Sequence, residues 1–259
     1  TQESRRLEAV ADLKVGQISM WLEERRADVR AAAGNPRFGT MYEQWIRLKD
    51  PALRAGVLER MEAVRSAYGY ARVAILDGRG ELVLSSGGDF VPAMVLRDTV
   101  MQALRDGRDA DTGFYRDDSE RDVPVRLDFV APLRGVAGGT PLVIVLQVDP
   151  ARFLFSYLQG WPGPSRTAET LLFMRDGNDL LFITPLRHLA GPPLSVRIPL
   201  SRRDALAAIV TEHPERRGVA FEAADYRGVA VVGVGRGVPG TAWTLVAKVD
   251  AEEMYEGSR

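Results

Sequence analysis

The segment 106–128 holds the residue types best suited to recognising a small molecule in this 259-residue chain. It mixes the aromatic residues Phe114 and Tyr115 with arginines and several acids. Ligand pockets combine aromatic walls with a few placed polar groups. Two arginines on one wall could hold a carboxylate or a similar anion through charge-assisted hydrogen bonds. The composition of this segment therefore predicts a pocket, with an anion as the favoured ligand.

Side-chain alternation decides which of these residues can share a face. In a strand expected at residues 125–133, Arg126 and Asp128 share one face and the apolar residues between them point the other way. The same rule places Tyr70 and Arg72 on one face of an earlier strand. The alternative is a set of surface salt bridges on an exposed sheet face. The predicted ligand-binding residues are Tyr70, Arg72, Asp111, Tyr115, Arg116, Arg126 and Asp128.

A glycine motif could suggest a dinucleotide site. Gly235-Arg-Gly-Val-Pro-Gly240 spells G-x-G-x-x-G. The dinucleotide fingerprint leaves a strand and opens a helix, whereas a strand is expected to follow here at residues 243–249. A related segment at 134–139 also fits an ordinary turn. We therefore interpret the motif as a turn between two strands.

Catalytic and metal motifs are weak. His188 and His213 are the only histidines, and neither has a metal-like or Ser/Asp partner nearby in sequence. The segment 109–113 begins like a calcium loop but lacks the later ligands at the required spacing. We predict no catalytic residue, no metal site and no cofactor, and hence no enzymatic activity in this chain.

Composition limits the class of protein. The formal net charge is −1, with 46% hydrophobic and 27% charged residues, which is typical of a globular domain with a real core. Near-zero charge argues against a nucleic-acid partner. The absence of cysteine excludes disulfides, Cys-ligated zinc and thiol chemistry. No apolar run approaches the ~20 residues that span a bilayer, so any membrane anchor is expected outside this segment.

The N-terminal segment predicts a long helix. Apolar residues recur there at helical spacing, and Gly34, Asn35 and Pro36 give a stop signal. Two shorter helices are expected near residues 42–49 and 51–67. The apolar face of the long helix is formed by Leu7, Ala11, Val15, Ile18, Leu22 and Val29.

After this helical region a pattern occurs twice, at an offset of about a hundred residues. An apolar run ending in Asp-Gly appears at 71–78 and at 170–177, and a run ending in Val-Asp appears at 146–149 and at 247–250. Each copy reads as a hairpin, a helical crossover and an antiparallel strand pair. The sequence therefore predicts an α+β fold, in which two tandem PAS-like units, each with a roughly five-stranded antiparallel sheet, follow the long helix.

The expected boundaries follow from this repeat. Trp161-Pro-Gly-Pro164 cannot continue a helix and marks the join between the units. Asp250 and Glu253 suggest a capping box that starts a C-terminal helix. The expected parts are helices at 1–68, a first PAS-like unit at 69–150, a connector at 151–168, a second unit at 169–250 and the start of a helix at 251–259.

Four stretches make the chain resemble double Cache sensor domains, most closely those attached to bacterial histidine kinases and diguanylate cyclases. They are residues 13–25 (LKVGQISMWLEER), 161–170 (WPGPSRTAET), 225–228 (DYRG) and 239–250 (PGTAWTLVAKVD). The resemblance implies a periplasmic or extracellular module between two transmembrane helices. It also implies a ligand in the membrane-distal PAS-like unit and a homodimer contact through the long helix.

The function implied by this resemblance is extracytoplasmic small-molecule sensing for a transmembrane histidine kinase in a two-component phosphorelay. Amino-acid-binding members carry a Tyr/Arg/Trp/Tyr cluster ahead of the first unit's strands, and the absence of a recognisable counterpart argues against an amino-acid ligand. Several alternatives remain open. The same module could serve a diguanylate cyclase or a chemoreceptor, or the chain could be a soluble periplasmic enzyme or a ligand-free dimerisation module.

Overall fold

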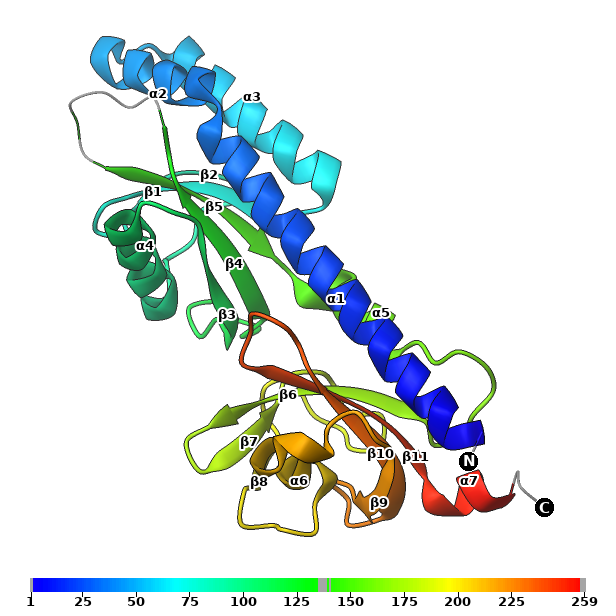
Figure 1. Ribbon diagram of the computed structural model, residues 1–259. Helices are drawn as coiled ribbons and strands as arrows, with labels where there is room; N and C mark the ends of the chain where they lie inside the picture. The colour runs from blue at the N-terminus through cyan, green and yellow to red at the C-terminus, as the bar shows by residue number, and fades with distance from the viewer. Residues whose placement is uncertain (1, 135–138, 140, 257–259) are drawn as a thin grey trace. The chain divides into compact units, whose positions relative to one another are not determined.

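The computed structural model describes residues 2–134, 139 and 141–256. The chain forms two compact units: the first unit is residues 22–150, and the second unit is residues 1–21 with 151–259. Each contains an antiparallel sheet, which confirms the predicted α+β fold with two PAS-like units (Figure 1). The helical region expected at 1–68 is divided between the units, because helix α1 (Gln2–Gly34) contributes to both.

The N-terminal helices follow their sequence signals. Helix α1 ends at Gly34, as predicted, and its apolar face is buried except for the partly buried Val15. Helices α2 (Pro36–Leu48) and α3 (Pro51–Tyr68) each begin with proline. The side chains of Asn35 and Asp50 cap them by accepting hydrogen bonds from backbone N–H groups two residues on. Both helices start at or before the positions expected from the sequence.

The sheet of the first unit has the order β2-β1-β5-β4-β3. Its edge strand β3 lies in a stretch that the sequence did not identify as a strand, because polar residues dominate it. Helix α4 (Met94–Asp106) connects β2 to β3. The expected turn at 134–139 falls largely on residues 135–138, which lie outside the described residues. The strands are β1 (Arg72–Asp77), β2 (Leu82–Ser86), β3 (Ala110–Arg116), β4 (Val125–Pro132) and β5 (Leu142–Val148).

Helix α4 covers one face of this sheet (Figure 1). Alternate strand residues form an apolar core with it, whereas their neighbours point to the opposite face, where α3 packs on β1 and β2. The core under α4 contains Ala74, Leu76, Val130, Val143 and Val145 from the sheet, and Leu96, Val100 and Ala103 from the helix.

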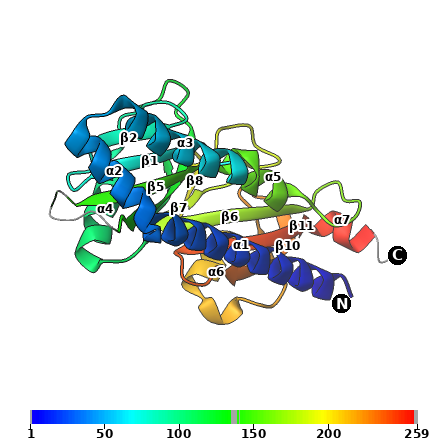
Figure 2. The ribbon, with the colours of Figure 1, turned by 90° about the horizontal axis from the view of Figure 1, so that it is seen from above.

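The sheet of the second unit has six strands, one more than expected, in the order β8-β7-β6-β11-β10-β9. Its central strands β6, β11 and β10 lie side by side in Figure 2. The extra strand, β8, is a three-residue edge strand without periodicity of its own. The strands are β6 (Glu169–Asp176), β7 (Asp179–Phe182), β8 (Arg197–Pro199), β9 (Phe221–Ala224), β10 (Ala230–Gly237) and β11 (Trp243–Asp250). The helices that accompany them are α5 (Leu154–Gln159), α6 (Leu206–Glu212) and α7 (Ala251–Glu256), with short 3₁₀ turns at Pro150–Arg152 and Pro214–Arg216.

The glycine motif serves helix packing rather than phosphate binding. Strand β10 runs through the first part of the motif and the chain then turns into β11, as the turn interpretation predicted. A Cβ atom at Gly235 would lie 2.8 Å from Cγ1 of Val210, and one at Gly233 would lie 2.3 Å from Cδ2 of Leu206. Because both contacts come from α6, glycine lets this helix approach the strand closely.

The expected capping box at the start of α7 is wrong. Glu253 turns away from Asp250 and accepts hydrogen bonds from the connector, at distances of 2.8 Å from Oγ of Ser165 and 2.8 Å from the backbone nitrogen of Thr167. The Thr167 hydroxyl also donates to Glu253 and accepts a bond from the backbone nitrogen of Asp250. The connector thus fastens the start of α7, a contact between segments that sequence spacing cannot show.

Within the described residues, no helix combines the length and apolar character required to cross a bilayer.

Candidate functional site

The face under α4 in the first unit changes from apolar to polar along its strands. Arg72 lies two residues before the core residue Ala74, and Asp128 lies two residues before Val130. Strand register places Arg72 and Asp128 on either side of Gln147. We call this group the Arg72 cluster; its members are Arg72, Tyr115, Asp117, Glu120, Arg126, Asp128 and Gln147.

Two arginines share one carboxylate in this cluster. Nη1 of Arg72 donates to Oε1 of Glu120 over 2.7 Å and to Oε1 of Gln147 over 2.8 Å. Nη2 of Arg126 donates to the same Glu120 oxygen over 3.2 Å. The Arg72 and Arg126 side chains are only 13% and 10% exposed. The ring of Phe90 lies 4.9 Å from the Arg72 guanidinium and forms an aromatic wall beside it.

A second polar pair lies on the same face. The hydroxyl of Tyr115 donates to Oδ2 of Asp128 over 2.5 Å, and strand pairing sets Tyr115 opposite Arg126. Asp128 is fully buried, and burial raises the pKa of its carboxyl group to about 7. Burial also raises the pKa of Tyr115. The carboxyl group of Asp128 therefore changes its charge near neutral pH.

Several buried polar atoms of the cluster have no hydrogen-bond partner among the residues that the structure describes. Leaving such an atom unsatisfied costs about 1–3 kcal/mol, so native proteins rarely gather them. Their concentration on one sheet face indicates a surface shaped for a bound molecule. The atoms are Nε of Arg72, Nε of Arg126 and Oδ2 of Asp117, whereas the side chain of Gln147 hydrogen-bonds to the carboxyl group of Asp128.

The structure separates the other predicted residues from this cluster. Tyr70 precedes β1, and its hydroxyl donates to Asp28 of α1. Asp111 pairs in register with Phe129, on the opposite face of the sheet, and contacts Arg26 of α1. Arg116 follows Tyr115 along β3 and so also faces the opposite side. The structure therefore does not bring Tyr70, Asp111 and Arg116 together with Arg72, and a ligand-binding role for them stays a prediction.

Sequence reasoning missed three members of the cluster. Gln147 could have been found from pairing of the first and last strands, because it lies directly opposite Arg72. Asp117 and Glu120 belong to the loop 117–124, which has no periodicity to predict where its side chains point. Only the folded loop brings Glu120 to both arginines.

The corresponding face of the second unit is occupied by its own side chains. Lys248 pairs in register with Glu169 as Gln147 does with Arg72. Its Nζ lies 2.9 Å from Oε2 of Glu169 and 3.0 Å from Oδ2 of Asp225, and all three residues are buried. The Tyr226 hydroxyl also donates to Glu169. The cavity beside this group measures only about 10 Å³, too little for a ligand.

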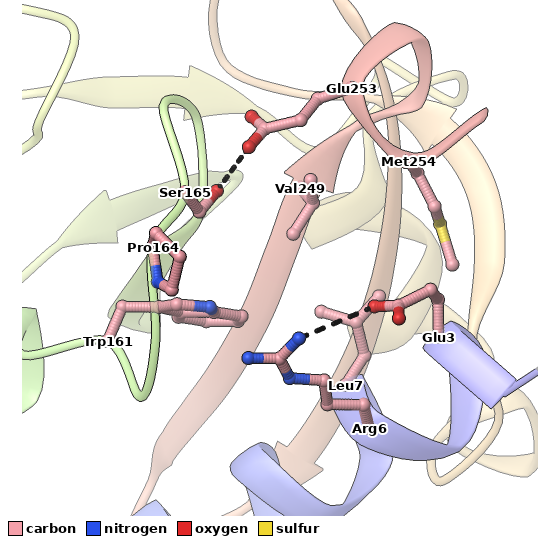
Figure 3. Close-up of a pocket in the computed structure, with 9 residues that line it drawn as sticks. All are labelled: Glu3, Arg6, Leu7, Trp161, Pro164, Ser165, Val249, Glu253 and Met254. Carbon is pink, nitrogen blue, oxygen red and sulfur yellow. Dashed lines mark hydrogen bonds and ion pairs between the residues drawn. The ribbon is translucent and has the colours of Figure 1, made fainter. Parts of the chain in front are cut away.

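The second unit also contains a larger cavity of about 200 Å³ (Figure 3). Leu7, Trp161 and Met254 supply apolar walls from α1, the connector and α7. Its polar groups are already engaged: Glu253 binds the connector, and the Arg6 guanidinium donates to the Pro162 carbonyl oxygen over 2.8 Å. This cavity therefore has an apolar wall but lacks the unsatisfied buried polar atoms of the Arg72 cluster.

Neither histidine side chain belongs to the Arg72 cluster, and His188 lies beside the buried group of the second unit. The backbone N–H of His188 donates to the Tyr226 hydroxyl over 3.2 Å, and the His213 ring lies 3.1 Å from Glu215 at the surface. Across the described part of the chain, no group of three or more His, Cys, Asp and Glu side chains is arranged to hold a metal ion.

The chain is similar in structure to known proteins, although its sequence identity to them is low. No protein-family model matches the chain, and no curated protein matches it in sequence. Many solved structures resemble it, among them three ligand-binding domains that match it over nearly their whole length.

The ligand-binding domain of the Campylobacter jejuni chemoreceptor Tlp3, in complex with L-norvaline, has a TM-score of 0.70 and 13% identity; the match covers 97% of this chain and 92% of that chain. The corresponding domain of Pseudomonas fluorescens CtaA, with L-serine, has a TM-score of 0.61 and 14% identity, covering 97% and 98%. That of the Pseudomonas aeruginosa amino-acid chemoreceptor PctC, with GABA, has a TM-score of 0.61 and 17% identity, covering 96% and 100%. The chain thus has the fold of these chemoreceptor ligand-binding domains, the tandem PAS-like architecture that its resemblance to double Cache domains predicted.

Proposed function

We propose that this chain is the extracytoplasmic small-molecule sensing module of a bacterial transmembrane receptor, and that the ligand binds the Arg72 cluster of the first unit. The observation that carries the proposal is the set of unsatisfied buried polar atoms on one sheet face. A bound molecule would supply their missing partners. The corresponding face of the second unit supports this choice, because Lys248 already lies between two carboxylates there.

The cluster offers complementary charges to a ligand. Arg72 and Arg126 present guanidinium groups for a carboxylate, whereas Asp117 and Asp128 present buried carboxyl oxygens for a hydrogen-bond donor such as an ammonium group. The named ligands of the structural neighbours, L-norvaline, L-serine and GABA, carry both groups. We therefore include amino acids among the ligands, although this sequence lacks the aromatic cluster of amino-acid-binding members.

The output of the parent receptor is a separate proposal. The sequence resemblance favours a histidine kinase of a two-component system, and the structural neighbours favour a chemoreceptor. A diguanylate cyclase remains an alternative. Sequencing the gene beyond this segment distinguishes the three outputs, because each has its own cytoplasmic domain.

Signalling by such a module requires two states. A ligand shifts their balance only if it binds one state more tightly than the other. Helix α1 contributes residues to both units, so we propose that it couples the ligand site to the membrane and forms the contact of a homodimer. We also propose that the module itself catalyses no reaction.

A binding experiment tests the proposed site. Thermal-shift screening of amino acids, small carboxylic acids and amines should identify a ligand, and calorimetry should then compare Arg72→Ala and Arg126→Ala with the wild type. Each substitution should weaken binding of a carboxylate ligand by about 1.5–3 kcal/mol, the value of a hydrogen bond to a charged group.

The matched control lies in the second unit. Tyr226→Phe removes the hydroxyl that donates to Glu169 and should leave binding unchanged. If Tyr226→Phe abolishes binding while both arginine variants bind normally, the ligand site lies in the second unit and the assignment to the Arg72 cluster is wrong.

A further inference from the structure

The carboxylate of Glu120 occupies the position in which a ligand carboxylate would meet the arginines. One of its oxygens, Oε1, accepts from Arg72 over 2.7 Å and from Arg126 over 3.2 Å. Its second oxygen lies 3.4 Å from the same Arg126 nitrogen. The hydrogen bond from Arg72 holds the pKa of Glu120 below its usual range, so the group is an anion at neutral pH. The protein thus supplies a carboxylate of its own to this arginine pair.

Glu120 reaches the arginines from a small closed loop rather than from the sheet. The backbone N–H of Asp117 donates to the carbonyl oxygen of Pro124 over 2.8 Å and closes the loop at its base. Val123 has φ of 43°, a conformation that costs a β-branched residue about 1–3 kcal/mol. The Ser119 hydroxyl donates within the loop to Oδ1 of Asp117, and it lies 3.2 Å from the carbonyl oxygen of Val91 outside the loop. Apart from the bonds of Glu120 to the arginines, the only hydrogen bond from residues 118–123 to a side chain or backbone group outside the loop, within the described residues, is the long one from Ser119 to Val91, so this part of the loop is weakly attached.

The arginines retain binding capacity even with Glu120 in place. Nε of Arg72 and Nε of Arg126 are buried and have no hydrogen-bond partner within the described residues. A guanidinium matches a carboxylate best through two parallel hydrogen bonds, and Glu120 gives Arg72 only one. A free carboxylate could therefore engage these donors more completely than the tethered one does.

We propose that Glu120 is a tethered competitor of the ligand: its carboxylate occupies the Arg72–Arg126 pair in the empty module, and a ligand carboxylate binds by displacing it together with residues 118–123, while the buried Asp117 stays in place. This inference rests on the proposed ligand site and names its ligand class as carboxylates. Displacement lowers the apparent affinity, because each binding event must first break the Glu120 contacts. Displacement also means that ligand binding moves the loop segment that carries Glu120.

The test uses acetate as a minimal carboxylate and acetamide as its neutral counterpart. Calorimetry at constant ionic strength should compare the wild type with Glu120→Gln, which keeps the shape but loses the charge, and with Glu120→Ala, which removes the group. Acetate should bind Glu120→Ala at least about tenfold more tightly than the wild type, with Glu120→Gln between them. Acetamide should bind the wild type and both Glu120 variants with equal affinity. Adding Arg72→Ala to Glu120→Ala should abolish the gain in acetate affinity.

Glu81→Ala is the matched control. Glu81 forms an ion pair with a single arginine, Arg97, whose side chain is 33% exposed, elsewhere in the first unit. Freeing that arginine should not raise acetate affinity to a comparable extent, because water already solvates it.

Two failures are distinguishable. If the folded Glu120 variants bind acetate no more tightly than the wild type, while Arg72→Ala still weakens the ligand found by screening, the tethered competitor is ruled out and the ligand site stands. If Arg72→Ala leaves the screened ligand unaffected, the ligand site itself is wrong, and the proposal for Glu120 is wrong with it.

Discussion

The hydroxyl of Tyr115 donates a hydrogen bond to Oδ2 of Asp128 over 2.5 Å, between neighbouring strands of the first sheet. Asp128 is fully buried, and its carboxyl group is also hydrogen-bonded by the side chain of Gln147. Burial raises the pKa of Asp128 from an ordinary 3.8 to about 7. This carboxyl group links the stability of the first unit to pH.

We predict that the free energy of unfolding of the wild type falls as the pH rises from about 4 to 7. The variant Asp128→Asn should not show this fall. In that interval the folded protein keeps a proton on Asp128 that the unfolded chain releases, so raising the pH favours unfolding. The raised pKa corresponds to about 4 kcal/mol across the interval. Urea unfolding at several pH values should show the stability of Asp128→Asn, relative to the wild type, increasing with pH.

Asp98→Asn provides the control for this measurement, since Asp98 lies exposed on α4. Its stability relative to the wild type should not change across the same pH range. A parallel pH dependence in Asp128→Asn and the wild type would show that the buried carboxyl group does not cause it.

Glu253→Gln should destabilise the attachment of α7 to the connector by about 2 kcal/mol at pH 7. Burial would raise the pKa of Glu253, but hydrogen bonds from Thr167, Arg166 and Ser165 hold it at about 2. Because the folded pKa lies below the unfolded value of 4.5, this stabilisation is present above pH 4.5 and is lost toward pH 2. Denaturation at pH 7 and pH 3 should show the difference between variant and wild type shrinking at the lower pH.

The neighbouring Glu252→Gln is the control for Glu253→Gln, because Glu252 is exposed on the same helix. It should change stability by less than about 0.5 kcal/mol. Equal losses in the two variants would contradict the role assigned to the connector contacts.

Lys248→Met should destabilise the second unit by about 3–5 kcal/mol, since it leaves Glu169 and Asp225 buried without their shared cation. Adding Glu169→Gln should restore part of the loss by removing the unpaired charge, whereas Asp225 keeps its ion pair with Arg227. Urea unfolding of the single variant and of the double variant Lys248→Met with Glu169→Gln checks this. A loss below about 1 kcal/mol in Lys248→Met would show that water reaches the group and that the face is not closed to ligands.

Helix α1 should provide the dimer contact through Leu13 and Met20. These residues are 53% and 66% exposed and lie on the same side of the helix, because seven residues make about two turns. The double variant Leu13→Glu with Met20→Glu should sediment as a monomer at concentrations at which the wild type is a dimer. Met94→Glu is the control, because Met94 is 79% exposed on α4. A monomeric wild type, or a double variant that still dimerises, would refute the contact.

Local signals in the sequence determined much of the fold. Proline and glycine mark the helix ends, as at Gly34 and Pro36, since their backbone preferences act within a few residues. Alternation along β4 correctly put Arg126 and Asp128 on one face, because side-chain direction repeats every second residue. The repeat predicted two sheets, since the same strand order recurs along the chain.

Tertiary structure alone decided which polar groups meet. The sequence predicted a strand that already included Tyr70, and side-chain alternation then put Tyr70 on the same face as Arg72. In the structure the strand begins at Arg72, and the Tyr70 hydroxyl donates to Asp28 instead. Glu120 meets Arg72 across 48 residues through an irregular loop, and Lys248 meets Asp225 and Glu169 in a buried ion group. Spacing along the chain cannot show such contacts, because loop conformation and strand register set them.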